Sequence, residues 1–75
     1  MMLSMAKIGE TVTIKKITGK DDTRRFLANL GFIEGVDLRI VSELNGDMII
    51  NIKESRIALG KSMGNRVIVA LNKEK

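Results

Sequence analysis

Ten residues at positions 26–35, FLANLGFIEG, constrain the fold most, because they form a short apolar helix that runs into two glycines. We expect Gly31 to stand just past the helix end in a left-handed conformation, since glycine has no Cβ to disfavour it there. Phe32 should then pack back onto Leu27 in the last helical turn. Gly35 is expected to make a second bend before the next strand. The stretch therefore predicts a helical corner between two strands.

The helix that leads into this corner has an expected start and an expected buried face. Asp21 or Asp22 can cap it by accepting a hydrogen bond from a free backbone N–H group. Phe26, Leu27 and Leu30 fall at helical spacing and are predicted to form the buried face. About ten residues are too few for a stable isolated helix, so packing of that face must stabilise it.

Alternation of apolar and polar residues, together with β-branched content, predicts the strands. These are expected at residues 11–17, 36–44, 48–53, 56–59 and 66–71. Asn45 and Gly46 stand between two apolar runs, and this pair is typical of a type I′ hairpin turn. A strict two-residue turn would mix the faces of the paired strands. We therefore expect a bulge near Ile40 and Val41.

The remaining segments are expected to complete a small core. Leu3, Met5 and Ile8 belong to a lead-in that should cap the core, and residues 61–65 look like a single helical turn. The last strand is expected to be covered on both faces. Residues 72–75 are expected to be a frayed tail.

Length and composition fit one domain over residues 1–75. The chain is 44% hydrophobic but only 3% aromatic, so aliphatic side chains must supply the packing. Together these features predict a mainly β fold, a small SH3-like barrel of about five strands with one inserted short helix and a helical turn. Such barrels host many unrelated functions, so the architecture alone assigns none.

The residue types argue against catalysis. The sequence has no histidine and no cysteine, and so no conventional acid–base pair, no thiolate and no nitrogen or sulfur site for zinc. The carboxylates are scattered, which gives direct iron binding no cluster. We expect a non-enzyme without a cofactor or metal site. No apolar run approaches the roughly 18 residues that span a bilayer, and no signal peptide is recognisable, so a cytoplasmic location is expected.

The net charge of +4 leaves open a partner that carries negative charge. The one loose basic cluster comprises Lys15, Lys16, Lys20, Arg24 and Arg25. A solvated surface is the favoured interpretation, and a nucleic-acid-binding barrel is the alternative. Base stacking would need exposed aromatic rings. Phe26 and Phe32 are the only candidates, and both are expected in the core.

The order of several motifs resembles a known family. These are Leu30-Gly31-Phe32 with Gly35, the Asn-Gly hairpin, RIALG at residues 56–60, Met63-Gly64 and the apolar run at residues 67–69. Together they resemble the ferrous iron transport protein A (FeoA) family over almost the whole chain. Where that family often has proline, glycine and alanine, this chain has Glu34, Ser55 and Gly64, in turns and at a helix contact.

The resemblance implies a cytoplasmic accessory protein of ferrous iron transport. It would act by contact with FeoB, the membrane transporter that carries a GTP-binding domain, and would be peripheral to the membrane only through that partner. No nucleic-acid partner is implied. We expect the contact near the corner and the last hairpin, at Phe32, Ile33, Arg56 and Met63. Packing of Ile33 and Met63 at the barrel end is an equally good interpretation. Gly31, Gly35, Asn45 and Gly46 are expected to serve the turns.

Overall fold

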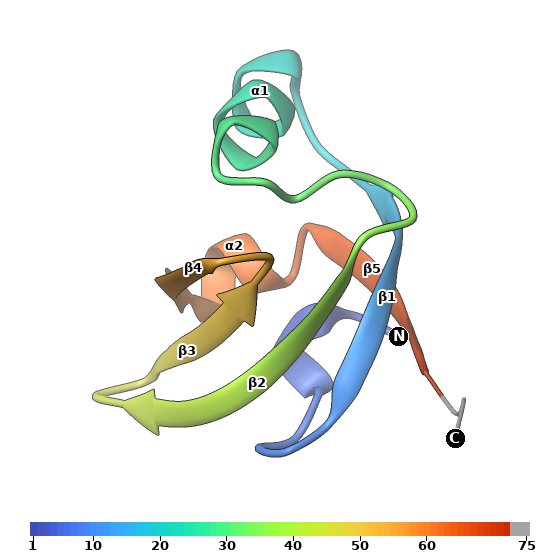
Figure 1. Ribbon diagram of the computed structural model, residues 1–75. Coiled ribbons are helices and arrows are strands. Elements are labelled where there is room, and N and C mark those ends of the chain that lie inside the picture. Colours follow the sequence, from blue (N-terminus) through green and yellow to red (C-terminus); the bar gives the residue numbers. More distant parts are fainter. Residues whose placement is uncertain (73–75) are drawn as a thin grey trace.

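The computed structural model describes residues 1–72. In chain order the elements are the 3-10 turn η1 (Leu3–Met5), β1 (Thr11–Ile17), α1 (Asp21–Asn29), β2 (Asp37–Leu44), β3 (Asp47–Ile52), β4 (Ser55–Gly60), α2 (Lys61–Gly64) and β5 (Val67–Leu71) (Figure 1). Each predicted strand is present, and its ends differ by one residue at most. Among residues 1–72 there is no helix of the length and apolarity that a membrane crossing needs.

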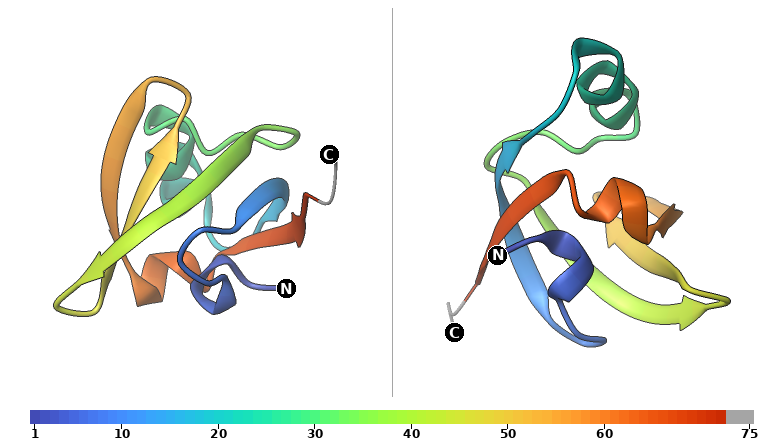
Figure 2. Two further views of the ribbon diagram at one scale, coloured as in Figure 1. Left: turned by 60° about the horizontal axis from the view of Figure 1, so that its bottom comes forward. Right: turned by 180° about the vertical axis from the view of Figure 1, so that it is seen from behind.

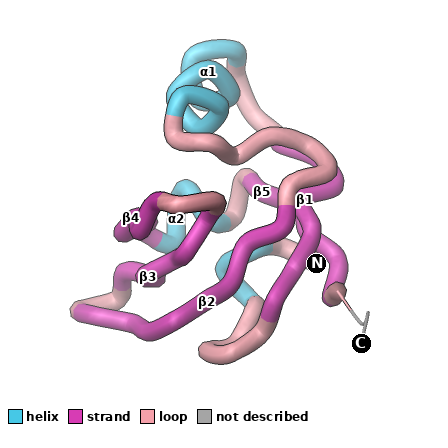
Figure 3. The backbone as a smooth tube through the Cα atoms, viewed as in Figure 1, coloured by secondary structure: helices cyan, strands magenta, loops and turns pink. Residues whose placement is uncertain are grey.

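The strands form one antiparallel sheet in the order β4-β3-β2-β1-β5. The sheet curls into a small barrel, and α2 packs against β4 and η1 (Figure 1). Helix α1 is inserted between the neighbouring strands β1 and β2 and stands at one end of the barrel. Two loops connect it to those strands (Figure 3). A site at this end is therefore built by α1, the loop that follows it, and the end of β1.

The core is aliphatic apart from one phenylalanine. Its buried members are Leu3, Ala6, Val12, Ile14, Ile17, Leu27, Phe32, Leu38, Ile40, Met48, Ile50, Ile52, Leu59, Val67 and Val69. No polar or charged residue of the described part of the chain is buried. Packing of apolar side chains, which is non-directional and scales with buried area, therefore holds the fold together.

The predicted bulge in the hairpin is confirmed. Strand pairing passes from Ile40↔Ile50 directly to Ser42↔Ile49, which leaves Val41 as the extra residue. At the hairpin turn, φ is 53° at Asn45 and 87° at Gly46, as a type I′ turn requires. The bulge places Leu38 and Ile40 opposite Ile52 and Ile50, and all four face the core.

A second bulge, in β1, was not predicted. Pairing with β5 shifts between Ile14 and Lys16, and Ile17 is buried directly after two exposed lysines. With strict alternation from Ile14, Ile17 would face away from the core. The shift of one residue places it on the core side.

The lead-in caps the core only through part of its apolar residues. Leu3 is buried as predicted, but Met5 is 61% and Ile8 58% exposed, so the prediction is wrong for these two. A 3-10 turn repeats every three residues. Ala6 therefore returns to the side of Leu3 and is buried, whereas Met5 lies on the outside.

Coverage of the last strand is partial. Val67 and Val69 are buried and Ile68 is half-buried, but Leu71 is exposed, so the prediction of cover on both faces fails at the strand end. What cover there is on the outer edge comes from the N-terminal segment. Met2 makes an antiparallel bridge to Ile68, and this segment runs beside β5 (Figure 2).

The frayed tail begins later than predicted. The backbone N–H of Asn72 donates to the Thr11 carbonyl at 3.0 Å, and its side-chain amide donates to the Asp37 carboxylate at 3.0 Å. Asn72 is thus tied to β1 and β2, and the prediction is wrong for it. Residues 73–75 lie outside the described residues.

Candidate protein-contact surface

The corner after α1 has the hydrogen bonds of a Schellman motif. The Phe32 N–H donates to the Leu27 carbonyl and the Gly31 N–H to the Ala28 carbonyl, each at 2.9 Å, and φ at Gly31 is 102°. Leu27 and Phe32 both belong to the core, with Phe32 only 1% exposed. The predicted corner is confirmed, and it anchors α1 to the barrel.

The start and the buried face of α1 differ from prediction. Lys20 is the N-cap residue and no side chain caps the helix, so the predicted cap by Asp21 or Asp22 is wrong. Both aspartates lie in the first turn, where negative charge still suits the helix dipole.

Phe26 is 49% exposed, contrary to the predicted buried face. The side that faces the barrel follows Thr23, Leu27 and Leu30, which are buried or half-buried. Phe26 precedes Leu27 by one residue, about 100° around the helix, and so points to one side.

The loop after the corner is tied to β1. Gly35, whose φ is 88°, donates its N–H to the Ile14 carbonyl at 2.8 Å, and Ile14 donates to the Val36 carbonyl at 2.9 Å. The Val36 N–H in turn reaches the Ile33 carbonyl at 3.1 Å. The predicted bend at Gly35 is confirmed. These bonds hold Ile33 at the surface, where it is 49% exposed.

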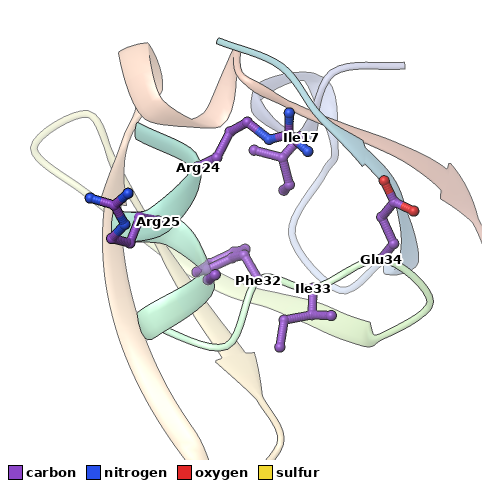
Figure 4. A pocket seen from close by; sticks show the side chains of 7 residues that line it. Ile17, Arg24, Arg25, Phe32, Ile33 and Glu34 are labelled. Atoms are coloured by element: carbon purple, nitrogen blue, oxygen red, sulfur yellow. The ribbon is translucent and has the colours of Figure 1, made fainter. Parts of the chain in front are cut away.

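A hollow of about 430 Å³ lies between α1, this loop and the end of β1. Its lining residues are Ile17, Arg24, Arg25, Ala28, Phe32, Ile33 and Glu34 (Figure 4). Phe32 and Ile17 are buried and lend the hollow an apolar floor, whereas Ile33 is exposed at its edge. An apolar cavity with a few charged groups at its edge is the usual form of a binding site.

Charges of both signs stand around the floor. Arg24 and Arg25 come from α1, and Glu34 comes from the loop on the other side of Ile17 (Figure 4). Arg25 lies 3.7 Å from Asp22, and both side chains are largely exposed. Solvent screening makes such an exposed pair weak, so it leaves Arg25 available to a ligand.

The structure brings together two of the four predicted contact residues. Phe32 and Ile33 both line the hollow, Phe32 from below and Ile33 at the edge. Arg56 lines a different, polar hollow of about 270 Å³ at the β3–β4 turn, where its Nε donates to Asn51 Oδ1 at 3.0 Å. Met63 is half-buried on α2 and packs against the core.

Three lining residues were not predicted as site residues: Ile17, Ala28 and Glu34. Arg24 and Arg25 were named only in the basic cluster of the nucleic-acid alternative. The sequence contained one signal for this lining: Arg24 and Ala28 are four residues apart and therefore share a helix face. The burial of Ile17 depends on the β1 bulge, which the sequence did not reveal.

The hollow can bind a complementary surface but has no group for catalysis by a histidine or a thiol, since the sequence contains neither. Glu34 is the single carboxylate among the described residues that line it. Across residues 1–72, histidine, cysteine and acidic side chains nowhere gather in a group of three or more that could hold a metal ion.

Comparison with known proteins finds relatives along nearly the whole chain. The model of the FeoA domain family matches residues 1–71. A Methanocaldococcus jannaschii protein named "Putative Fe(2+) transport protein A" is 34% identical over 67 residues, which cover 89% of this chain and 82% of that protein.

Solved structures of FeoA proteins also resemble this chain. An iron uptake regulatory protein, FeoA, matches with a TM-score of 0.86 and 28% identity, over 93% of both chains. FeoA of Stenotrophomonas maltophilia, solved in complex with zinc and described as an SH3 domain protein, gives a TM-score of 0.82 and 25% identity. That match covers 93% of this chain and 89% of the other. The predicted SH3-like fold is confirmed, and the chain belongs to the FeoA family of ferrous iron transport proteins.

Proposed function

We propose that this FeoA-family chain is a cytoplasmic accessory protein that acts on ferrous iron transport by binding a FeoB-type transporter. The contact surface is the hollow beside α1. The observation that carries the proposal is the exposed Ile33 at the edge of an apolar floor, held by the corner and the bonds to β1. An exposed apolar side chain that continues an apolar hollow is typical of a contact site.

The family context supports a role in transport rather than in catalysis. The S. maltophilia relative is described as a candidate ferrous iron transport activating factor. The chain lacks histidine and cysteine, and the hollow pairs no acid with a base. Binding to the transporter, without a reaction of its own, is therefore the activity we assign.

A titration tests the partner and the surface together. Isotope-labelled protein is mixed with the cytoplasmic GTP-binding domain of a FeoB transporter at moderate salt, and backbone amide shifts are followed. We expect shifts concentrated at Ala28, Phe32 and Ile33. If no amide moves, this domain of the transporter is not the partner. Shifts at Arg56 and Asn51 instead would move the contact to the β3–β4 turn.

A charge placed at Ile33 tests the surface alone. Ile33→Asp should weaken binding about tenfold or more, since it puts a charge where apolar area is buried. Leu44→Asp is the matched control, because Leu44 is 64% exposed at the hairpin turn, away from the hollow. Unchanged binding by a folded Ile33→Asp variant would contradict the assigned surface. Met63→Gln tests whether α2 belongs to the same contact.

Nucleic-acid binding is the second candidate, and the exposure of Phe26 favours it. This ring is 49% exposed on the helix that carries Arg24 and Arg25, and exposed rings can stack on bases. The same labelled protein titrated with single-stranded RNA decides. Shifts over residues 15–25 with RNA, and none with the FeoB domain, would favour this alternative.

A further inference from the structure

The hollow beside α1 is polarised in charge. Arg24 and Arg25 stand on the α1 side, and Glu34 stands on the loop side (Figure 4). Among the described residues, the guanidinium of Arg24 has no ion-pair or hydrogen-bond partner. A positively charged side chain without a partner, next to buried apolar surface, favours a ligand that brings negative charge to that side.

The floor specifies the other half of the ligand. Ala28 and Ile33 present exposed apolar surface, and the buried side chains of Ile17 and Phe32 lie beneath it. A space of about 430 Å³ accommodates one or two large aliphatic or aromatic side chains. Removing such side chains from water is the main favourable term in association, and the charges around the floor then set orientation and specificity.

We propose that the hollow binds an acidic amphipathic segment of a partner protein. A large apolar side chain of that segment sits on the Phe32 floor, a carboxylate faces Arg24, and the residue opposite Glu34 is neutral or basic. The partner itself rests on the proposed function, whereas the chemistry of the bound segment follows from the hollow alone.

The same arrangement is poorly suited to a phosphate backbone. Glu34 lines the hollow on the loop side, so a chain that is negative along its whole length would place phosphates against this carboxylate, whereas a protein segment can present a neutral or basic residue there. Most of the floor is also apolar and would gain little from a phosphate chain.

Two synthetic peptides test the proposal without any transporter. Both have about ten residues, blocked ends and the same Leu and Phe residues; one carries Glu and the other Lys at the remaining charged positions. Added to the labelled protein, the Glu peptide should shift the amides of Arg24, Ala28 and Ile33. Its Kd should be at least about tenfold lower than that of the Lys peptide, and the difference should shrink as salt is raised.

Charge variants locate the effect. Arg24→Glu should weaken binding of the Glu peptide about fivefold, which matches the modest strength of an exposed charge pair. Glu34→Lys should strengthen it. Arg39→Glu is the control for Arg24→Glu, because it makes the same change of net charge at an exposed residue of β2 outside the hollow. It should have little effect on binding of the Glu peptide.

Three results would overturn the proposal: equal affinity for the two peptides, shifts away from the hollow, or no shift with the Glu peptide up to about 5 mM. The two proposals fail separately. If the FeoB domain binds at the hollow while the peptides show no charge preference, the proposed function stands and this inference falls. If the Glu peptide binds there and the FeoB domain does not, only the partner is wrong.

Discussion

Gly31 ends α1 in a backbone conformation with positive φ, which residues with a Cβ disfavour. Its φ is 102°, yet a Cβ built there would meet only Ile52 Cδ1, at 3.9 Å. Gly31→Ala should therefore cost about 1 kcal/mol or more of unfolding free energy from backbone strain alone. Gly60→Ala is the control, because Gly60 has an ordinary φ of −70°. Equal stability of the two variants in urea unfolding would contradict the strain argument.

Lys53 has a φ of 55° although it is not glycine, so its backbone conformation is one that side chains disfavour. It stands in the tight β3–β4 turn, where Ile52 pairs with Ser55. Lys53→Gly should raise the free energy of unfolding by about 0.5–1 kcal/mol, after the greater chain entropy of glycine is subtracted. Glu54→Gly in the same turn removes no such strain and should lower stability. A loss of stability in both variants would refute this account.

The two phenylalanines show what the sequence can settle for a single residue. Phe32 was predicted from a local motif whose hydrogen bonds involve neighbouring residues, and it is buried as expected. Phe26 lies among several apolar residues of a nine-residue helix, any of which could face the barrel. Only docking of the helix through Thr23, Leu27 and Leu30 decides that Phe26 is exposed.

At the scale of elements, α2 and η1 approach each other too closely for a large side chain. A Cβ at Gly64 would lie 3.3 Å from Ser4 Cβ and 3.4 Å from the Ser4 backbone. Ser4 also donates a hydrogen bond to Asn65 across this contact. Glycine at this position therefore lets the lead-in pack close to α2.

Gly64→Val should push η1 away and cost about 1–3 kcal/mol of stability, as overpacking does. Ser62→Val is the control, because it places the same β-branched residue on an exposed position of α2. Amide shifts at residues 2–6 should appear in the first variant and be absent in the second. Equal unfolding free energies would show that η1 moves aside without cost.

The two bulges mark how far strand register can be predicted. In the β2–β3 hairpin the turn at Asn45-Gly46 fixes the register, so the mismatch of faces can be worked out and the bulge at Val41 inferred. Strands β1 and β5 are separated by the chain from residue 18 to residue 66, and no turn sets their register. The bulge after Ile14 therefore became visible only in the folded chain.

For the whole molecule, the fold was more predictable than the site for one physical reason. Turns, caps and alternation are short-range features, and they suffice to define the five strands and the inserted helix. The hollow combines the end of β1, one face of α1 and the following loop. Phe32 and Ile33 were among the predicted contact residues, but Arg24 and Glu34 become neighbours of Ile17 only through tertiary packing (Figure 4).

Salt dependence at the scale of the whole chain separates the two candidate functions. If all five cations of the basic cluster contacted phosphates of a single-stranded nucleic acid, binding would release the counterions of those phosphates. The affinity of the protein for that nucleic acid would then fall roughly three thousandfold over a tenfold rise in salt. A contact with an apolar floor and the two arginines of the hollow should lose about tenfold or less over the same range. Binding to the FeoB domain measured by calorimetry at several salt concentrations gives this slope. A steep slope would mean that dispersed positive charge, and not the apolar hollow, drives the association.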